Sequence, residues 1–290
     1  MRQARRPEEV PMSWSIHHGE AWEWLRSLPS ASADALVTDP PYSSGGFTRG
    51  DRSADPTTKY RASDARESTE SFSGDTRSEW ECLAWLALWL TEAHRVLREG
   101  APVVIATDWR QGPIVSAAIG AAGFVRRGQV TWTKLGASRP QLGRFRGDAE
   151  YFPWGSKGPM PLRGPALAGT FESGPGEDVY ECDAPGDWPS VAPEIACAPV
   201  PGARRLHLTE KPVLVMESIV GIVPEGGLVL DPFAGSGSTG VACIRRGRAF
   251  AGCELSAHYH ALASRRLEAE ARGVDGVASA MGGQLALGAR

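Results

Sequence analysis

The stretch GLVLDPFAGSGSTGVACIRRGRAFAGCE (Gly227–Glu254) decides the fold class of this chain. It predicts a buried strand over Gly227–Leu230, a Gly-rich turn, a helix over Thr239–Arg246 and a second strand over Ala249–Glu254. A strand, a helix and a strand in this order form parallel pairs with right-handed crossovers. The sequence therefore predicts an α/β protein with a mostly parallel central sheet.

The Gly-rich turn in this stretch has the features of a ligand-binding loop. Gly235 and Gly237 allow the backbone to approach a ligand closely, and the following helix offers free N–H groups at its start. Glu254 has roughly the spacing at which an acid binds ribose hydroxyls in dinucleotide-type folds. The turn lacks the lysine of a triphosphate-binding loop. An adenosine-containing ligand is indicated; the alternatives are a solvated acid at Glu254 and a local cap at Asp231.

A second motif, VTDPPY (Val37–Tyr42), ends another predicted strand, Ala35–Thr38. Proline has no N–H group and a fixed φ, so Pro40 and Pro41 force a rigid exit from this strand. The exit lies at the strand's carboxyl end, where open α/β sheets bind their ligands. A plain strand-to-loop stop would have the same appearance, so the motif alone leaves both interpretations open.

Hydrophobic periodicity predicts the other elements. Helices are expected over Glu20–Leu28, Trp80–Leu97, Pro113–Ala122 and Pro212–Val223, and strands over Ser15–His18, Pro102–Thr107, Gln129–Lys134 and Glu150–Trp154. Residues 43–79 are rich in Ser, Thr, Gly, Asp and Arg, and we expect a mobile lid there because the segment begins directly after VTDPPY. From Gly158 to Arg205 regular periodicity is lost.

Composition excludes several classes of protein. The 290 residues are 42% hydrophobic with a formal net charge of −3, so no global basic field points to a polyanion. The five cysteines show no C-x-x-C spacing and the six histidines no H-x-x-x-H pair, so we expect reduced thiols and no metal site. The longest apolar run, Cys82–Leu90, is too short to span a bilayer. A protein of the cytoplasm without membrane partners is expected.

Three motifs in this order, DPPY, TEKP (within His207–Pro212) and DPFAGSGSTG, resemble the amino-methyltransferases of DNA. The catalytic motif precedes the cofactor motif, as in the permuted β class. The phrases TDPPYSSGG, TDWRQ and EYFPWGSKGPM are similar to phage and prophage members. The resemblance covers roughly residues 15–268 and implies a Rossmann-like catalytic domain, here residues 1–290, with a target-recognition insertion over 159–206.

The resemblance also implies the ligands and the residues that bind them. S-adenosylmethionine (SAM) is the expected cofactor and double-stranded DNA the expected partner. At the position of Glu20 the family commonly has Asp, which faces the adenine of the cofactor. The implied cofactor residues are Glu20, Asp39, Lys211, Asp231, Pro232, Phe233, Gly235, Gly237 and Glu254. The implied catalytic residues are Asp39, Pro40, Pro41 and Tyr42.

The chemistry of the reaction explains the catalytic motif. An exocyclic base amine is a poor nucleophile because its lone pair is delocalised into the ring. The carboxylate of Asp39 and the C=O of Pro40, whose direction the two prolines lock, can accept the two N–H groups of the amine. Tyr42 offers an aromatic face on which the base stacks. The amine is inaccessible inside a duplex, so the target nucleotide must be flipped out.

A local basic segment could contact DNA phosphates. Eight basic residues lie between Arg126 and Arg163, opposed by two acids, Asp148 and Glu150. The DNA contacts that we predict are Lys134, Arg139, Arg144, Arg146 and Lys157. The alternative is a solvated basic face. By contrast, Gly164–Val200 carries seven acids and no base, and its role is left open.

The predicted function is site-specific methylation of the adenine N6 amine, because a leading Asp before P-P-Y is mostly associated with adenine in this family. The alternatives are an N4-cytosine methyltransferase, a non-catalytic DNA- or cofactor-binding homologue, and an enzyme that methylates RNA or protein amines. The sequence does not identify the recognition sequence or a restriction partner, and it leaves open whether the protein forms a homodimer.

Overall fold

The computed structural model describes residues 14–41, 77–134, 149–161, 167–173, 179–181 and 210–273, together with Gly143, Phe145 and Gly147. Four predicted site residues, Tyr42, Arg139, Arg144 and Arg146, lie outside these ranges. So does most of the two predicted insertions, 43–79 and 159–206.

The described strands form a single sheet in the order β1-β9-β8-β2-β3-β5-β4-β6-β7. Their bounds are β1 (Trp14–His18), β2 (Ala35–Thr38), β3 (Pro102–Ile105), β4 (Val125–Lys134), β5 (Ala149–Ser156), β6 (Thr170–Ser173), β7 (Val179–Glu181), β8 (Leu228–Asp231) and β9 (Ala249–Glu254). The run β1-β9-β8-β2-β3 is parallel throughout, while β5 is antiparallel to both β3 and β4. The predicted α/β class with a mostly parallel sheet is confirmed.

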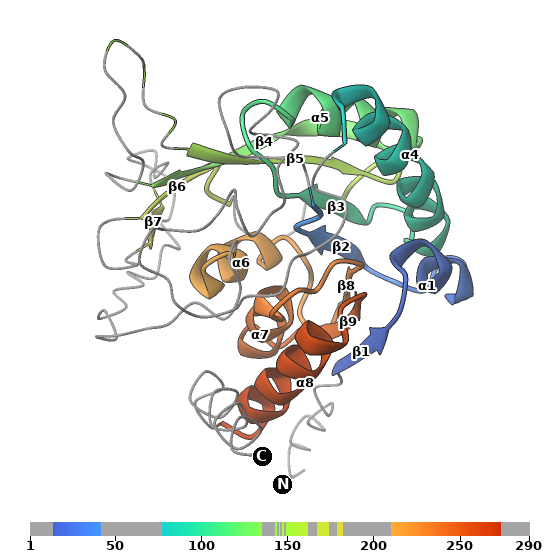
Figure 1. Ribbon diagram of the computed structural model, residues 1–290, viewed down its shortest axis with the longest axis vertical. Coiled ribbons are helices and arrows are strands. Elements are labelled where there is room, and N and C mark those ends of the chain that lie inside the picture. Colours follow the sequence, from blue (N-terminus) through green and yellow to red (C-terminus); the bar gives the residue numbers. More distant parts are fainter. Residues whose placement is uncertain are drawn as a thin grey trace, which may run out of the picture.

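Helices cover both faces of this sheet (Figure 1). They are α1 (Ala21–Ser27), α4 (Glu79–Val96), α5 (Gly112–Ala121), α6 (Val213–Val220), α7 (Ser238–Arg245) and α8 (Ala257–Ala271). Successive side chains of a strand point to opposite faces, and β2 shows this directly. Leu36 packs with α1, α4 and α5 in one core, whereas Ala35 and Val37 pack with α6 and α7 in the other. The central strands are therefore buried on both faces.

Four elements, α8, β6, β7 and α4, differ most from the sequence-based expectations. Helix α8 was not predicted, because charged residues, including the buried Arg266, interrupt its apolar face. Short strands β6 and β7 lie where no periodicity was found, and they extend the sheet beyond β4. Helix α4 starts at Glu79 with a capping box between Ser78 and Glu81, so the last residue of the predicted lid belongs to a helix.

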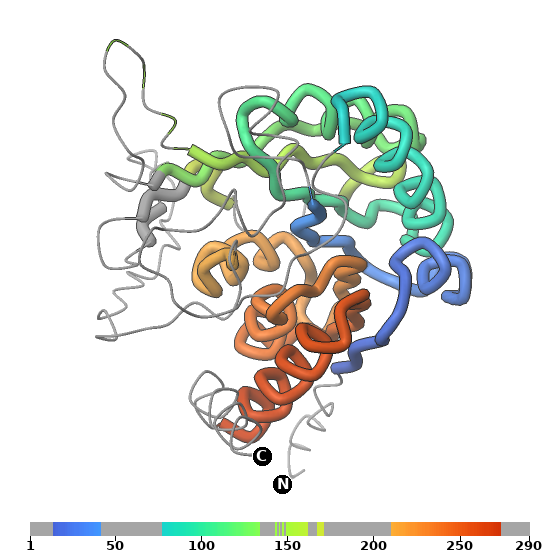
Figure 2. Tube along the Cα trace, viewed as in Figure 1, coloured from blue at the N-terminus to red at the C-terminus, as the bar shows by residue number. Residues whose placement is uncertain are grey.

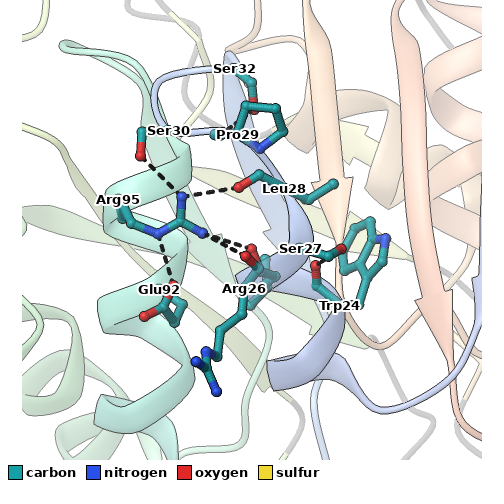
Figure 3. Close-up of polar contacts among 10 residues, drawn as sticks. Trp24, Arg26, Ser27, Leu28, Pro29, Ser30, Ser32, Glu92 and Arg95 are labelled. Carbon is teal, nitrogen blue, oxygen red and sulfur yellow. Dashed lines mark hydrogen bonds and ion pairs between the residues drawn. The ribbon is translucent and has the colours of Figure 1, made fainter.

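Arg95 of α4 binds the end of α1 and the segment that leads from α1 to β2 (Figure 3). Its guanidinium donates to the carbonyl oxygens of Leu25 and Leu28, both at 3.0 Å, and to Ser30 Oγ at 3.0 Å. Glu92, one turn earlier on α4, holds the Arg95 Nε at 2.9 Å. These contacts tie the end of α1 to α4, so the chain enters β2 along a defined path.

The first and the last described strands along the chain, β1 and β9, pair in the sheet. Figure 2 shows the blue trace of β1 beside the orange trace of β9, in agreement with the pairing of Trp14 with Phe250 and of His18 with Glu254. The carboxyl ends of these two strands therefore lie together. Among the residues that the structure describes, no helix has the length and apolar character needed to cross a membrane.

Candidate active site

Acidic side chains gather at the carboxyl edge of the parallel strands. Parallel neighbours end at the same edge of a sheet, so residues that follow these strands lie close together. In the order of the sheet they are Glu20, Glu254, Asp231, Asp39 and Asp108. Strand β5 runs in the opposite direction, so its start, with Glu150, lies at this edge too, where Tyr151 bridges to Thr107. Six acids therefore lie at this edge of the sheet.

Asp39 shares a buried cation with Glu150. Lys211 Nζ lies 2.6 Å from Asp39 Oδ2 and 3.2 Å from Glu150 Oε2. The Lys211 side chain is only 4% exposed, against 22% for Asp39 and 16% for Glu150. The structure thus joins the DPPY motif to the TEKP motif, 172 residues apart, through an ion pair. Asp39 is the most accessible member of the three.

Asp231 fastens the Gly-rich loop to β2. Its Oδ1 accepts from Thr38 Oγ1 at 2.6 Å and from the Phe233 N–H at 3.1 Å, and Thr239 also bonds its carboxyl group. Burial is the largest cause of a raised pKa of about 6 for Asp231, and the nearby charge of Asp39 also raises this pKa. The hydrogen bonds from Thr38, Thr239 and Phe233 lower it but do not cancel the effect of burial. Asp231 therefore lies beneath the loop and fixes its position.

Glu254 closes the loop from the other side. Its two oxygens accept from the backbone N–H groups of Gly235 and Ser256, both at 2.8 Å. Burial raises its pKa, while these hydrogen bonds oppose the rise. Each carboxylate oxygen has a second lone pair, so Glu254 can still accept from a ligand hydroxyl.

The two loop glycines are required for different reasons. Gly235 has φ +52°, and a Cβ added there would meet nothing within 4 Å, so open space lies beside its backbone. Gly237 has φ +88°, and a Cβ there would lie 3.2 Å from the Cβ of Ala263 in α8. Gly235 therefore leaves room for a ligand, whereas Gly237 satisfies the turn and the packing of α8.

The other predicted cofactor residues surround this loop. Pro232 is buried, and the Phe233 ring packs 5.3 Å from those of Trp85 and Trp89, which anchors the loop to α4. Glu20 is exposed and caps α1 by accepting from the N–H groups at its start. The N–H of Gly19 donates to the Glu254 carbonyl at 3.0 Å, which places Glu20 beside the loop.

Sequence reasoning missed a second buried ion pair. Arg266 of α8 donates to Glu210 Oε1 at 2.6 Å and to the Ser236 carbonyl at 3.2 Å, and its side chain is 5% exposed. Glu210 precedes Lys211 and Ser236 lies inside the Gly-rich loop. Arg266 therefore links the two motifs. Glu210 belongs to the TEKP motif and could have been identified from it. Its partner Arg266 could not, because it lies in α8, a helix that the sequence pattern did not predict.

The structure separates the predicted DNA contacts. The end of β4, Lys134, is at the catalytic edge, because Thr133 pairs with Ala149 at the start of β5. Lys157 follows the other end of β5, and its Nζ donates to the Leu97 carbonyl at 2.9 Å. The structure does not bring Lys157 to Asp39: it lies at the opposite edge, because a strand places its two ends at opposite edges of the sheet.

Comparison with known proteins establishes the family. The family model for DNA methylases of the N6/N4 type matches residues 33–265. The chain belongs to this DNA methylase family. The predicted DNA amino-methyltransferase is thereby confirmed at the level of the family, while the methylated base is not decided.

Relatives and solved structures agree with this DNA methylase assignment. The type II methyltransferase M.ScaI of Streptomyces caespitosus is 25% identical over 281 residues, covering 89% of this chain and 82% of M.ScaI. The crystal structure of an M1.HpyAVI–SAM complex has a TM-score of 0.57 at 22% identity and covers 88% of this chain and 98% of its own. The cytosine-N4-specific PvuII methyltransferase has a TM-score of 0.58 at 15% identity, covering 92% and 93%. The predicted Rossmann-like methyltransferase fold is confirmed.

Proposed function

We propose that this DNA methylase transfers a methyl group from SAM to the N6 amine of adenine at specific sites in double-stranded DNA. One observation carries the proposal: Asp39 of DPPY, Lys211 of TEKP and the loop of DPFAGSG lie together at the carboxyl edge of the sheet. This brings a hydrogen-bond acceptor for an amine beside a loop suited to an adenosine-containing ligand.

The residues present fit SAM. SAM carries a sulfonium and an ammonium group against one carboxylate, and the acidic edge favours a ligand with net positive charge. Gly235 leaves open space at the loop, and Glu254 can accept from the ribose hydroxyls. Pro232, Phe233, Gly237 and Asp231 shape the loop, while Glu20 adds an acid beside it. When bound, SAM supplies an activated methyl group on its sulfonium.

The chain's own groups then orient the base amine. Asp39 and the carbonyl of Pro40 accept the two N–H groups of the amine and stabilise the positive charge that develops on its nitrogen. Pro41 keeps this backbone rigid, and Tyr42, which lies outside the described residues, is proposed to stack on the flipped base. Proximity and orientation supply most of the rate, and no covalent nucleophile is required.

N4-cytosine methylation is the second candidate. The two amines present the same pair of N–H donors to the same acceptors, and the PvuII enzyme with a similar fold is cytosine-specific. The leading Asp39 of DPPY supports adenine, because the family associates that residue mostly with adenine. The recognition element is proposed to lie within 159–206.

Methyl transfer from labelled SAM to DNA, followed by mass spectrometry of the nucleosides, tests the proposed function. We expect N6-methyladenine; N4-methylcytosine in its place would overturn the base assignment. Transfer to RNA or protein without transfer to DNA would overturn the choice of DNA.

The substitution Asp39→Ala tests the proposed mechanism. It should lower methyl transfer at least about a hundredfold, because the amine loses its charged acceptor. Binding of SAM, measured by calorimetry, should change little, since Asp39 acts on the amine. Glu225→Gln, which removes an exposed acid at the opposite edge, is the control and should keep full activity. Full activity in Asp39→Ala would contradict the mechanism.

A further inference from the structure

We propose that Glu150 is a positioning residue for the catalytic carboxylate. It shares the Lys211 ammonium with Asp39, so that the ammonium neutralises the Asp39 carboxylate less and leaves it a stronger acceptor for the target amine. The inference rests on the proposed function, because the amine is the group that Asp39 is proposed to accept.

The three side chains form a charged group with two acids and one base. Lys211 Nζ lies 2.6 Å from Asp39 Oδ2 and 3.2 Å from Glu150 Oε2, and the lysine side chain is almost completely buried. A buried cation attracts a neighbouring carboxylate strongly, since little water screens the pair. With Asp39 as its only acid partner, Lys211 would neutralise the carboxylate that must attract the amine. Because Glu150 also binds the Lys211 ammonium, the attraction between Lys211 and Asp39 is weaker than it would be in an isolated pair.

The fold holds Glu150 and Lys211 firmly enough for this role. Glu150 pairs with Trp132 in the sheet, and the neighbouring Tyr151 exchanges two backbone hydrogen bonds with Thr107, of 2.8 and 2.9 Å. Lys211 stands between Glu210, which Arg266 binds at 2.6 Å, and Pro212. Glu150 lies within β5 and Lys211 lies two residues before α6, and support of this kind maintains the geometry of catalytic groups.

Other titratable groups face the same site and must be separated in any test. Asp231, at the end of β8, interacts electrostatically with Asp39, and its pKa is raised to about 6. Asp108, after β3, is coupled to Glu150 and to the guanidinium of Arg110. A pH profile of activity alone would therefore mix several groups. A signal that belongs to Asp39 itself is needed.

The test replaces Glu150 with an uncharged residue of the same shape. In Glu150→Gln, Lys211 loses its ion pair with Glu150 and pairs more strongly with Asp39, so kcat should fall about tenfold and the acid limb of kcat should move to lower pH by about one unit. Glu150→Asp keeps the charge and should keep the acid limb at its original pH. Glu225→Gln removes one negative charge at the opposite edge and should change neither quantity.

A second readout does not require methyl transfer. Carbon-13 carboxyl signals of labelled aspartate are followed against pH without DNA or SAM, and the Asp39 signal is identified by its absence in Asp39→Asn. Its titration midpoint should be about one pH unit lower in Glu150→Gln. If the unmutated protein methylated no DNA, the proposed function would fail while this titration still tested the charge arrangement. An unchanged midpoint, or lost activity explained by a lower melting temperature without a shift, would overturn the inference.

Discussion

At the scale of single residues, burial gives two strand-end aspartates different tasks. Asp39 keeps 22% of its side chain exposed and can meet a substrate, whereas Asp231 is fully buried and bonds Thr38 and Phe233. The DPPY and DPFAG motifs look alike in sequence, with an acid followed by proline. Only Asp39 is therefore proposed to contact the reacting amine.

The buried position of Asp231 predicts a pH-dependent stability. Its folded pKa of about 6 lies above its ordinary value of 3.8, so the folded state binds the proton more tightly than the unfolded state. Stability from this group is therefore present at low pH and is lost as pH rises from about 4 to about 6, by up to about 3 kcal/mol. Asn cannot ionise but keeps an oxygen for Thr38 and Phe233.

Urea unfolding of Asp231→Asn and of the unmutated protein measures this effect. The unfolding free energy of the variant, relative to the unmutated protein, should increase by about 2–3 kcal/mol between pH 4 and pH 7. A difference that stays constant over this range would show that Asp231 has no raised pKa.

At the scale of elements, the Arg266–Glu210 pair connects α8 to both functional motifs. Arg266→Met should lower the unfolding free energy by about 3–5 kcal/mol, because Glu210 would remain as a buried charge without this partner. The KM for SAM should rise several-fold, since Ser236 in the loop loses its contact with Arg266. Urea unfolding and initial rates at varied SAM provide the measurements.

Two further variants separate the ion pair from general damage to α8. Arg272→Met removes an exposed pair with Glu268 on the same helix and should cost at most about 0.5 kcal/mol. Arg266→Met combined with Glu210→Leu removes both charges and should recover much of the lost stability. Equal losses in Arg266→Met and Arg272→Met would rule out a special role for the buried pair.

At the scale of the whole molecule, charge is divided between two regions. The catalytic edge carries Asp39, Glu150, Asp231 and Glu254, which repel phosphates, whereas three of the predicted DNA contacts, Arg139, Arg144 and Arg146, come after β4 in the sequence. We therefore expect the basic segment to hold DNA while only the flipped base reaches the acidic edge. This separation leads to a prediction about salt dependence.

Replacing Arg144 and Arg146 together with Gln should weaken DNA binding and reduce the slope of log K against log salt by about 2. Lys157→Gln should leave that slope unchanged, because Lys157 lies at the opposite edge on the Leu97 carbonyl. Fluorescence anisotropy with a labelled duplex at several salt concentrations gives the slopes. A smaller slope in Lys157→Gln, with no change in the double variant, would contradict the placement of DNA.

The sequence by itself determined the class of the sheet and the motifs at its carboxyl edge. Prolines and glycines end strands locally, so Pro40, Gly235 and their neighbouring acids could be identified without knowing what packs around them. The tertiary structure alone decided which distant residues complete the site. Glu150 reaches Lys211 because β5 runs antiparallel to β3, and the same direction carries Lys157 away. Strand order and direction depend on packing across the whole chain, which local periodicity does not encode.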